Sequence, residues 1–254
     1  MRKKKLFFAL GMIVCAAIFG VSAFLLYQQM AEGRQSRQHF AEIAEQVKTE
    51  PDDKIQTLSA AEVYADVYAQ NHDLVGWINI EGTNIDYPVM QTREDPQYYL
   101  RRNFEKQSDR YGVPFLQTDC TPLQSDNCIL YGHNMKDGAM FADLCRYEDA
   151  DFCRTHSIIR FDTLEDFGIY QIIAVFKTTV EEQESFPYTQ FVEAENAKEF
   201  DNYVMQCKER SLYDITLTAK YGEKLLTLST CEYSRDNGRM VVVAKWIGNQ
   251  ANEE

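Results

Sequence analysis

The chain has 254 residues, 45% of them hydrophobic and 13% aromatic. This length and composition are typical of a globular protein with one ordinary domain and a short appendage. With 39 acidic and 26 basic residues the formal net charge is -13, and no block of Lys and Arg follows residue 5. The charge balance argues against a nucleic-acid-binding protein, which needs a basic face.

The N-terminus predicts a membrane span. Residues 2–5 are all Arg or Lys, and no residue from 6 to 27 carries a charge. At about 1.5 Å per residue, a helix of this length crosses a hydrocarbon core of about 30 Å. The positive-inside rule makes 1–5 a cytoplasmic basic tail and 6–27 a transmembrane signal anchor. The rest of the chain is then extracellular.

A cleaved signal peptide is the alternative, because Val21-Ser22-Ala23 offers small residues at a suitable spacing. The signal anchor is favoured, since apolar residues continue past that point to Leu26 and cleavable apolar regions are usually shorter. A buried core helix is disfavoured by the unbroken apolar run and its basic flank.

A polar stalk is predicted for residues 28–58, with a helix break at Thr49-Glu50-Pro51-Asp52-Asp53. The folded domain is predicted to cover residues 59–250. It begins with a helix for which Ser59 is the N-cap and Glu62 completes a capping box. Val63, Tyr64 and Val67 would form the inward stripe of this helix.

Short apolar runs separated by turn residues follow, and such runs predict β-strands. They lie at 75–80, 85–89, 113–116, 128–131, 158–161, 169–176, 224–229 and 240–246. Helical patterns occur at 139–147 and 193–208. The domain is therefore mostly β with several inserted helices. The pattern favours a barrel or a sandwich of about eight strands, and it does not separate the two.

Seven cysteines are present, of which Cys15 lies in the membrane segment. The others form no C-x-x-C pair, which argues against a structural zinc site. A Cys120–Cys128 disulfide remains an option in an exported domain. Except for Cys231, the cysteines outside the membrane segment are interpreted as small buried hydrophobic residues. These five are Cys120, Cys128, Cys145, Cys153 and Cys207.

Two polar residues lie where predicted strands end. Cys231 follows an apolar strand and precedes a polar stretch, and His133 follows the strand that ends at Gly132. Such positions expose a reactive group on a rigid backbone. Periodicity alone leaves open whether Cys231 is a core thiol and whether His133 is a solvated surface residue.

Together the two segments resemble the sortases, cysteine transpeptidases of the Gram-positive cell wall. The cysteine motif is Thr227-Leu228-Ser229-Thr230-Cys231 with Arg239 eight residues on, and the histidine motif is Tyr131-Gly132-His133-Asn134-Met135, followed by Gly138-Ala139-Met140-Phe141. The Ser in the first motif and the extended second motif are similar to class B. So are strand 86–89 and the helix near 193–208. The resemblance covers about residues 59–247.

The resemblance implies an eight-stranded sortase β-barrel with Cys231 and His133 on adjacent strand ends and Arg239 on the next strand. It makes Cys231 the nucleophile, which forms a thioester with the Thr of a sorting signal. His133 would be the general acid and base. Arg239 would hold the substrate backbone and stabilise the oxyanion.

Further residues are assigned by the same resemblance. The backbone N–H of Glu232 would assist Arg239 at the oxyanion, and Ser229 and Thr230 would line the substrate groove. Arg235 is assigned to solvent, because its spacing from Cys231 does not match the motif.

The implied substrates are surface proteins with a C-terminal sorting signal, of the Asn-Pro-x-Thr type for class B as a group. The implied acceptor is an amine of a peptidoglycan cross-bridge or of a lipid-linked precursor. The chemistry requires no metal or other cofactor. An exported cysteine endopeptidase, a pilin-polymerising sortase and a non-catalytic surface binding module are the alternatives.

Overall fold

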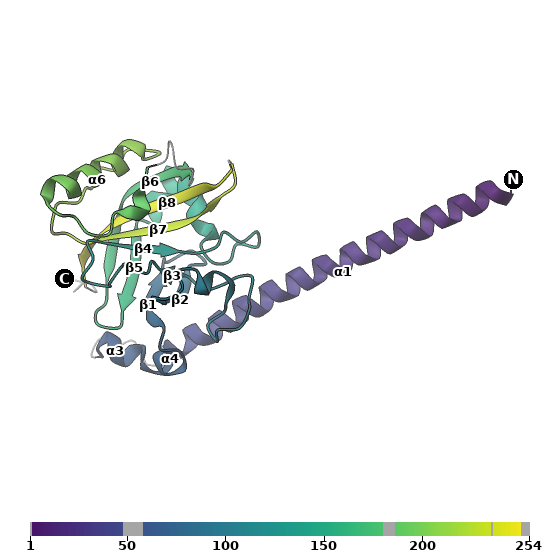
Figure 1. Cartoon of the computed structure of the whole chain (residues 1–254), viewed down its shortest axis with the longest axis horizontal. Helices are drawn as coiled ribbons and strands as arrows, with labels where there is room; N and C mark the ends of the chain where they lie inside the picture. The colour runs from purple at the N-terminus through teal and green to yellow at the C-terminus, as the bar shows by residue number, and fades with distance from the viewer. Residues whose placement is uncertain (1, 48–57, 180–185, 235, 250–254) are drawn as a thin grey trace. The chain divides into compact units, whose positions relative to one another are not determined.

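The structure is a computed structural model that describes residues 2–47, 58–179, 186–234 and 236–249. It divides into two compact units, Met1–Glu42 and Ile43–Glu254. The first consists of most of helix α1 (Arg2–Val47), and the second contains all the strands together with the last turn of α1 (Figure 1).

Helix α1 is long and apolar enough to cross a membrane, over the span Gly11–Val47. Between residues 12 and 30 its large apolar side chains, Phe19 and Leu26 among them, are exposed. The helix continues without interruption through residues 28–47, which the sequence predicted as the first part of a stalk. The predicted helix break at 49–53 lies outside the described residues.

Two short helices, α3 (Ala60–Val63) and α4 (Ala65–Gln70), precede the first strand. The capping box of Ser59 and Glu62 is present in both directions. Tyr64 and Val67 are buried as predicted, whereas Val63 is only half-buried. The Tyr64 hydroxyl donates to Asp162 Oδ2 at 2.7 Å, so the helices are joined to the barrel wall.

Eight strands close into a barrel in the order β1-β2-β3-β4-β7-β8-β6-β5. They are β1 (Leu74–Asn79), β2 (Asp86–Met90), β3 (Phe115–Leu116), β4 (Asn127–Tyr131), β5 (Ile158–Thr163), β6 (Ile169–Thr179), β7 (Leu225–Glu232) and β8 (Gly238–Gly248). Each of the eight predicted runs is a strand. The choice between barrel and sandwich, which periodicity left open, is settled for the barrel.

The strand order places segments from distant parts of the sequence side by side. β7 pairs with β4 in parallel and with β8 antiparallel, so it lies between them. All but one of the residues of β7 are buried, because the barrel interior and its outer covering each take one face of the strand. Such burial explains the nearly continuous apolar run from Leu225 to Leu228.

Helical insertions cover the barrel: η1 (Tyr98–Arg101), η2 (Ala142–Glu148), α5 (Ala150–Thr155), η3 (Tyr188–Gln190) and α6 (Ala197–Arg210). The helix expected at 139–147 is instead the 3-10 segment η2. It starts later because Met140 has a positive φ of 59° and forms a β-bridge with Asn134. Both features are incompatible with a right-handed helix at this residue.

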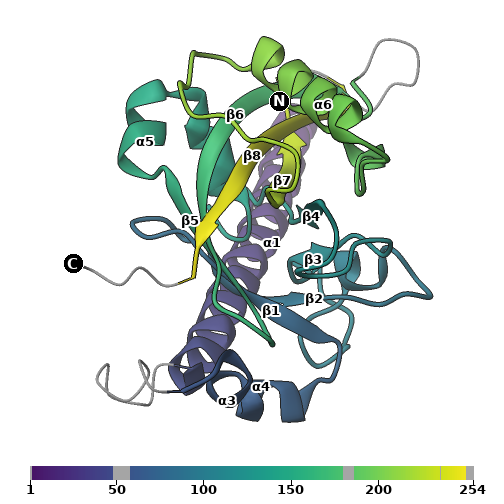
Figure 2. The same cartoon turned by 90° about the vertical axis from the view of Figure 1, so that its left-hand side faces the viewer.

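The helix expected at 193–208 is α6, and it begins only at Ala197. The side chain of Asn196 accepts a bond from the Glu199 N–H at 3.2 Å and so fixes the N-terminus there. Phe200 and Val204 of α6 pack with Ile173 and Phe176 of β6 in one apolar cluster. α6 therefore lies over the β6 side of the barrel (Figure 1 and Figure 2).

Candidate active site

His133 follows the end of β4. Gly132 precedes it, and a Cβ at Gly132 would lie 2.5 Å from the nearest carbon of the Phe141 ring. Only glycine therefore allows the aromatic ring to pack against this point of the chain. The loop then returns so that the Phe141 N–H donates to the His133 carbonyl at 2.8 Å. This local packing fixes the main chain that carries the histidine.

Cys231 lies near the end of β7, level with His133. The last pair of the β4–β7 ladder joins Tyr131 and Ser229, so two residues further on each strand the chain reaches His133 and Cys231. Thr230 Oγ1 donates to the Gly132 carbonyl at 2.8 Å and extends the contact between the two segments past the ladder. The parallel register therefore brings the histidine and the cysteine side by side.

Arg239 is the direct partner of Cys231 in the antiparallel β7–β8 ladder. Directly opposite residues in such a ladder have Cβ atoms about 4.5–5.5 Å apart. The Nη1 of Arg239 donates to the carbonyls of Gly238 at 2.9 Å and Asn237 at 3.4 Å. These bonds fix the guanidinium at the start of β8. His133, Cys231 and Arg239 thus form one row that runs from just past the end of β4 across β7 to β8.

The ring of His133 is held by a main-chain acceptor. Its Nε2 lies 2.7 Å from the carbonyl oxygen of Leu100 in η1. Because a carbonyl only accepts, Nε2 carries the hydrogen, and Nδ1 is the basic nitrogen of the neutral ring. Partial burial lowers the pKa of His133 below its ordinary value, and the charge of nearby Arg101 acts in the same direction. The histidine is thus predominantly neutral at pH 7.

A cavity of about 620 Å³ opens over this row. It is lined by Pro96, Gln97, Leu100, Phe115, Gln117, Thr118, Asp119, Tyr131, Gly132, His133, Tyr188, Thr189, Ser229, Thr230, Cys231 and Arg239. The volume is in the range of sites that take a small organic ligand or a short peptide segment. The wall combines aromatic rings with polar groups.

Of the three residues predicted to bind substrate, two line the cavity. Ser229 and Thr230 are both buried in its floor, and Ser229 Oγ is 2.7 Å from the hydroxyl of Tyr188. Glu232 does not line it. Although burial raises the pKa of Glu232, bonds from Ser234 and the charge of Lys177 outweigh this effect and lower it. The side chain of Glu232 is therefore an ionised partner of Lys177.

The main-chain N–H of Glu232 was predicted to help at the oxyanion. Alternate residues of a strand point their main-chain groups to alternate sides. The Ser229 carbonyl accepts from Gly132 on the β4 side, so the groups of Glu232 face β8, where its register partner is Gly238. An oxyanion role would require this N–H to leave the hairpin ladder, and it stays a prediction.

Comparison with known proteins identifies the family. The sortase domain matches residues 78–247. Sortase B of Listeria monocytogenes is 36% identical over 186 residues, which are 72% of this chain and 73% of that protein. The chain belongs to the sortase family. Sortases are cysteine transpeptidases, so the predicted enzyme class is confirmed.

Solved structures agree with this assignment. A Staphylococcus aureus sortase B–substrate complex gives a TM-score of 0.77 at 30% identity and covers 85% of this chain and 98% of that chain. A sortase B complexed with triglycine gives a TM-score of 0.76 at 28% identity, and the match covers 85% of this chain and 98% of that chain. The predicted sortase barrel and the resemblance to class B are therefore confirmed.

Sequence patterns did not indicate several residues of the sortase site. Two 3-10 segments, η1 and η3, are too short to give a periodic signal. The first contributes Leu100, and Gln97 directly precedes it. The second contributes Tyr188 and Thr189. Gln117 holds the wall together, since its side chain bonds to Tyr131, Asp119 and the Thr189 carbonyl. Only the closed barrel brings these segments together.

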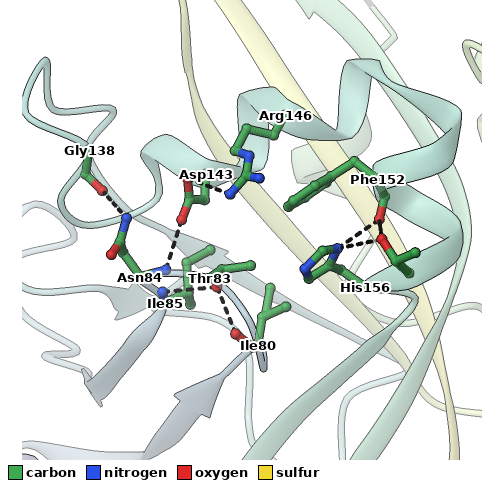
Figure 3. Close-up of polar contacts among 10 residues, drawn as sticks. Ile80, Thr83, Asn84, Ile85, Gly138, Asp143, Arg146, Phe152 and His156 are labelled. Carbon is green, nitrogen blue, oxygen red and sulfur yellow. Dashed lines mark hydrogen bonds and ion pairs between the residues drawn. The ribbon is translucent and has the colours of Figure 1, made fainter.

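The loop after His133 is fastened to the rest of the sortase domain at its far end (Figure 3). The Asn84 N–H donates to Asp143 Oδ2 at 2.8 Å, and Asn84 Nδ2 donates to the Gly138 carbonyl at 3.3 Å. Asp143 also pairs with Arg146, whose guanidinium stacks on the Phe152 ring. The β1–β2 turn and η2 thus hold this loop from two sides.

All seven cysteines are free thiols, so the optional Cys120–Cys128 disulfide is not formed. Instead the Cys120 thiol donates to the Asn127 carbonyl at 3.4 Å. Four of the five cysteines interpreted as small buried residues are buried, while Cys145 is only half-buried. Within the ranges that the structure describes, no group of three His, Cys, Asp or Glu could hold a metal ion. Arg235 lies outside those ranges.

Proposed function

We propose that this sortase is a membrane-anchored class B transpeptidase that cleaves a C-terminal sorting signal after Thr and transfers the protein to an amine. The observation that supports this most directly is the row formed by His133, Cys231 and Arg239 beneath one cavity. A thiol, a neutral imidazole and a guanidinium are the three groups that acyl transfer through a thioester needs.

The first half of the reaction forms the thioester. Nδ1 of neutral His133 takes the proton of the Cys231 thiol, which leaves a thiolate beside an imidazolium. Sγ of Cys231 then bonds to the carbonyl carbon of the Thr, and the negative charge moves to the carbonyl oxygen. Arg239 stabilises this oxyanion with its fixed planar donors. The amide C–N bond then breaks, and the leaving amine takes a proton from His133.

The second half transfers the acyl group. An acceptor amine gives a proton to His133 and bonds to the thioester carbon, and the C–S bond breaks to regenerate Cys231. The acceptor would be an amine of the peptidoglycan cross-bridge or of its lipid-linked precursor. One relative was solved as a complex with triglycine, which carries a free amine, and this supports an amine acceptor.

The sorting signal is proposed to be of the Asn-Pro-x-Thr type. The resemblance of the Cys231 and His133 motifs to class B supports this, as does the substrate complex of a relative. Ser229 and Thr230 are proposed to line the path of the peptide. Proteins that carry such a signal would be the physiological partners.

The proposed location is the cell membrane, with the N-terminus in the cytoplasm and the catalytic domain, residues 59–250, outside. Sortases are cell-surface enzymes, and α1 is a candidate span. The basic residues 2–5 precede the apolar run, so the positive-inside rule supports this orientation. Residues 28–58 would then connect the membrane to the domain.

The test uses mass spectrometry of the chain from about residue 28, incubated with an Asn-Pro-x-Thr peptide library and an amine acceptor. A thioester on Cys231 together with amine-capped product supports the transpeptidase. Capture of water alone would favour an exported cysteine peptidase. Absence of any adduct would favour a binding module, and dependence on a Lys of a second substrate would favour pilin polymerisation.

A further inference from the structure

The ladder between β4 and β7 stops just before the site. Tyr131 and Ser229 form its last strand pair, and the Gly132 N–H adds one bond to the Ser229 carbonyl at 3.2 Å. Main-chain groups face the same side of a strand at every second residue. The next carbonyl of β7 on this side belongs to Cys231. Because β4 ends at Tyr131, the strand itself supplies no donor at that level.

The side chain of Asn134 occupies the place of the missing donor. Its Nδ2 lies 2.8 Å from the Cys231 carbonyl oxygen and 3.2 Å from Sγ of Cys145 in η2. A primary amide carries two hydrogens on one nitrogen, so both bonds form together. The Asn134 carbonyl in turn accepts from the Tyr233 hydroxyl at 3.1 Å. Asn134 thus joins the loop after His133, η2 and the end of β7.

We propose that Asn134 is a positioning residue, which holds the main chain of Cys231 in line with His133. The inference rests on the proposed function, since it concerns the same site. His133 and Asn134 are adjacent, and their segment is fixed by the Asn134–Met140 bridge and the Phe141 N–H. One rigid segment therefore carries the general acid and base and also holds the nucleophile by its carbonyl.

The bond from Asn134 to the Cys231 carbonyl matters for catalysis because of where it lies. Cys231 is the second-last residue of β7, and a loop follows the strand. Strand ends next to loops open most easily, so the nucleophile needs support that the ladder does not supply. If Asn134 could not donate, the Cys145 thiol would still lie 3.9 Å from the Cys231 carbonyl oxygen, but a thiol is only a weak donor. A displacement of about 1 Å at a reacting atom costs about 10²-fold in rate.

The variant Asn134→Asp tests the proposal in the full-length chain, because aspartate keeps the shape of asparagine but cannot donate when ionised. Its carboxylate also repels the Cys231 carbonyl. For cleavage of a sorting peptide, kcat is expected to fall about 10- to 100-fold while KM changes less than about twofold. Asn202→Asp, on an exposed position of α6, introduces the same charge and should leave both constants unchanged.

Amide hydrogen exchange provides a second readout that needs no activity. In Asn134→Asp, exchange should accelerate in residues 229–234 and remain unchanged in the other strands. A kcat within about twofold of the parent overturns the proposal, as does a raised KM with unchanged kcat, which would place Asn134 in substrate binding. Accelerated exchange throughout the barrel would reduce Asn134 to a general structural role. If the parent cleaves no sorting peptide, the proposed function fails, and the exchange data alone decide whether Asn134 holds Cys231.

Discussion

Each of the three side chains in the row contributes a chemical property that its closest substitute lacks. The guanidinium of Arg239 is a planar fork with several donors, and its Nη1 already bonds to two carbonyls of the β8 end. His133 is neutral because burial and Arg101 oppose its protonation. Cys231 is the proposed attacking thiol. Single substitutions can therefore separate these contributions.

Substitution of Arg239 by Lys keeps the positive charge and removes the fork geometry. We expect Arg239→Lys to lower the cleavage rate by about 10²-fold, because the compact ammonium does not reproduce the planar fork of donors that a guanidinium presents to the oxyanion. Cys231→Ala should abolish turnover. Steady-state kinetics of peptide cleavage measures the rate of each variant. Arg154→Lys, at an exposed position of α5, is the control and should have normal activity. Near-normal rates in Arg239→Lys or Cys231→Ala would remove that residue from the mechanism.

The depressed pKa of His133 predicts a pH dependence of stability. Folded His133 binds a proton less readily than unfolded His133, whose pKa is near 6.5. As the pH falls through 6.5, the unfolded state binds more protons, so the free energy of unfolding decreases. The stability that His133 contributes by staying neutral is therefore fully present above pH 6.5 and is lost as the pH falls below it.

Denaturant unfolding at pH 8 and pH 5.5 checks this expectation. The difference between the two pH values should be smaller in His133→Asn than in the parent, because asparagine does not titrate. His72→Asn, near the start of the domain, serves as the control. An equal pH dependence in the parent and in His133→Asn would show that the fold does not oppose protonation of His133.

At the scale of secondary structure, the turn after β4 depends on the contact between Gly132 and Phe141. We expect Gly132→Ala to lower the free energy of unfolding by about 1–3 kcal/mol, because the added methyl overlaps a fully buried ring. Activity should fall with it, since the same turn carries His133. Chemical denaturation and peptide cleavage measure the two effects.

A double variant separates steric overlap from loss of glycine flexibility. Phe141→Leu removes part of the ring that the methyl would meet, so Gly132→Ala/Phe141→Leu should lose less stability than the sum of the two single changes. Additive losses would mean that the overlap with Phe141 is relieved elsewhere.

The sequence predicted the strands better than the helical segments, for a physical reason. Strands are runs of branched and aromatic residues, as in Val241–Val243, and these remain recognisable wherever the strand lies in the sheet. The 3-10 segments η1 and η3 are too short for any periodicity, yet they supply Leu100 and Tyr188 to the site. Local geometry such as the positive φ of Met140, which delays η2, is set by tertiary contacts.

At the scale of the whole molecule, the site depends on contacts that no local pattern contains. The bond between Thr230 and Gly132 spans 98 residues of sequence. The two motifs could be found separately, but periodicity alone gave no reason to join them. The resemblance to sortases supplied that link, and the parallel β4–β7 pairing explains it.

The proposed membrane attachment is tested at the scale of the whole chain. We expect the full chain to remain with the membrane fraction after a high-salt wash, because α1 as a membrane span would bury its apolar side chains in lipid. A chain that lacks residues 1–27 should be recovered in the soluble fraction and keep its peptide-cleavage activity. Fractionation followed by an activity assay checks both.

The mass of the mature protein provides the control for this experiment. An intact N-terminus is expected for a signal anchor. Loss of the residues up to Ala23 would show that a signal peptide is cleaved instead.

The parallel pairing of β4 and β7 also determines when the enzyme becomes reactive. Cys231 and Arg239 lie on the last two strands, and the row is complete only after both have docked beside β4, far earlier in the chain. Such distant pairing forms late in folding. During export with the N-terminus held in the cytoplasm, the part of the chain that follows the membrane span would emerge first. The site would stay unassembled until β7 and β8 arrive, which would delay reactivity until nearly the whole domain has crossed the membrane.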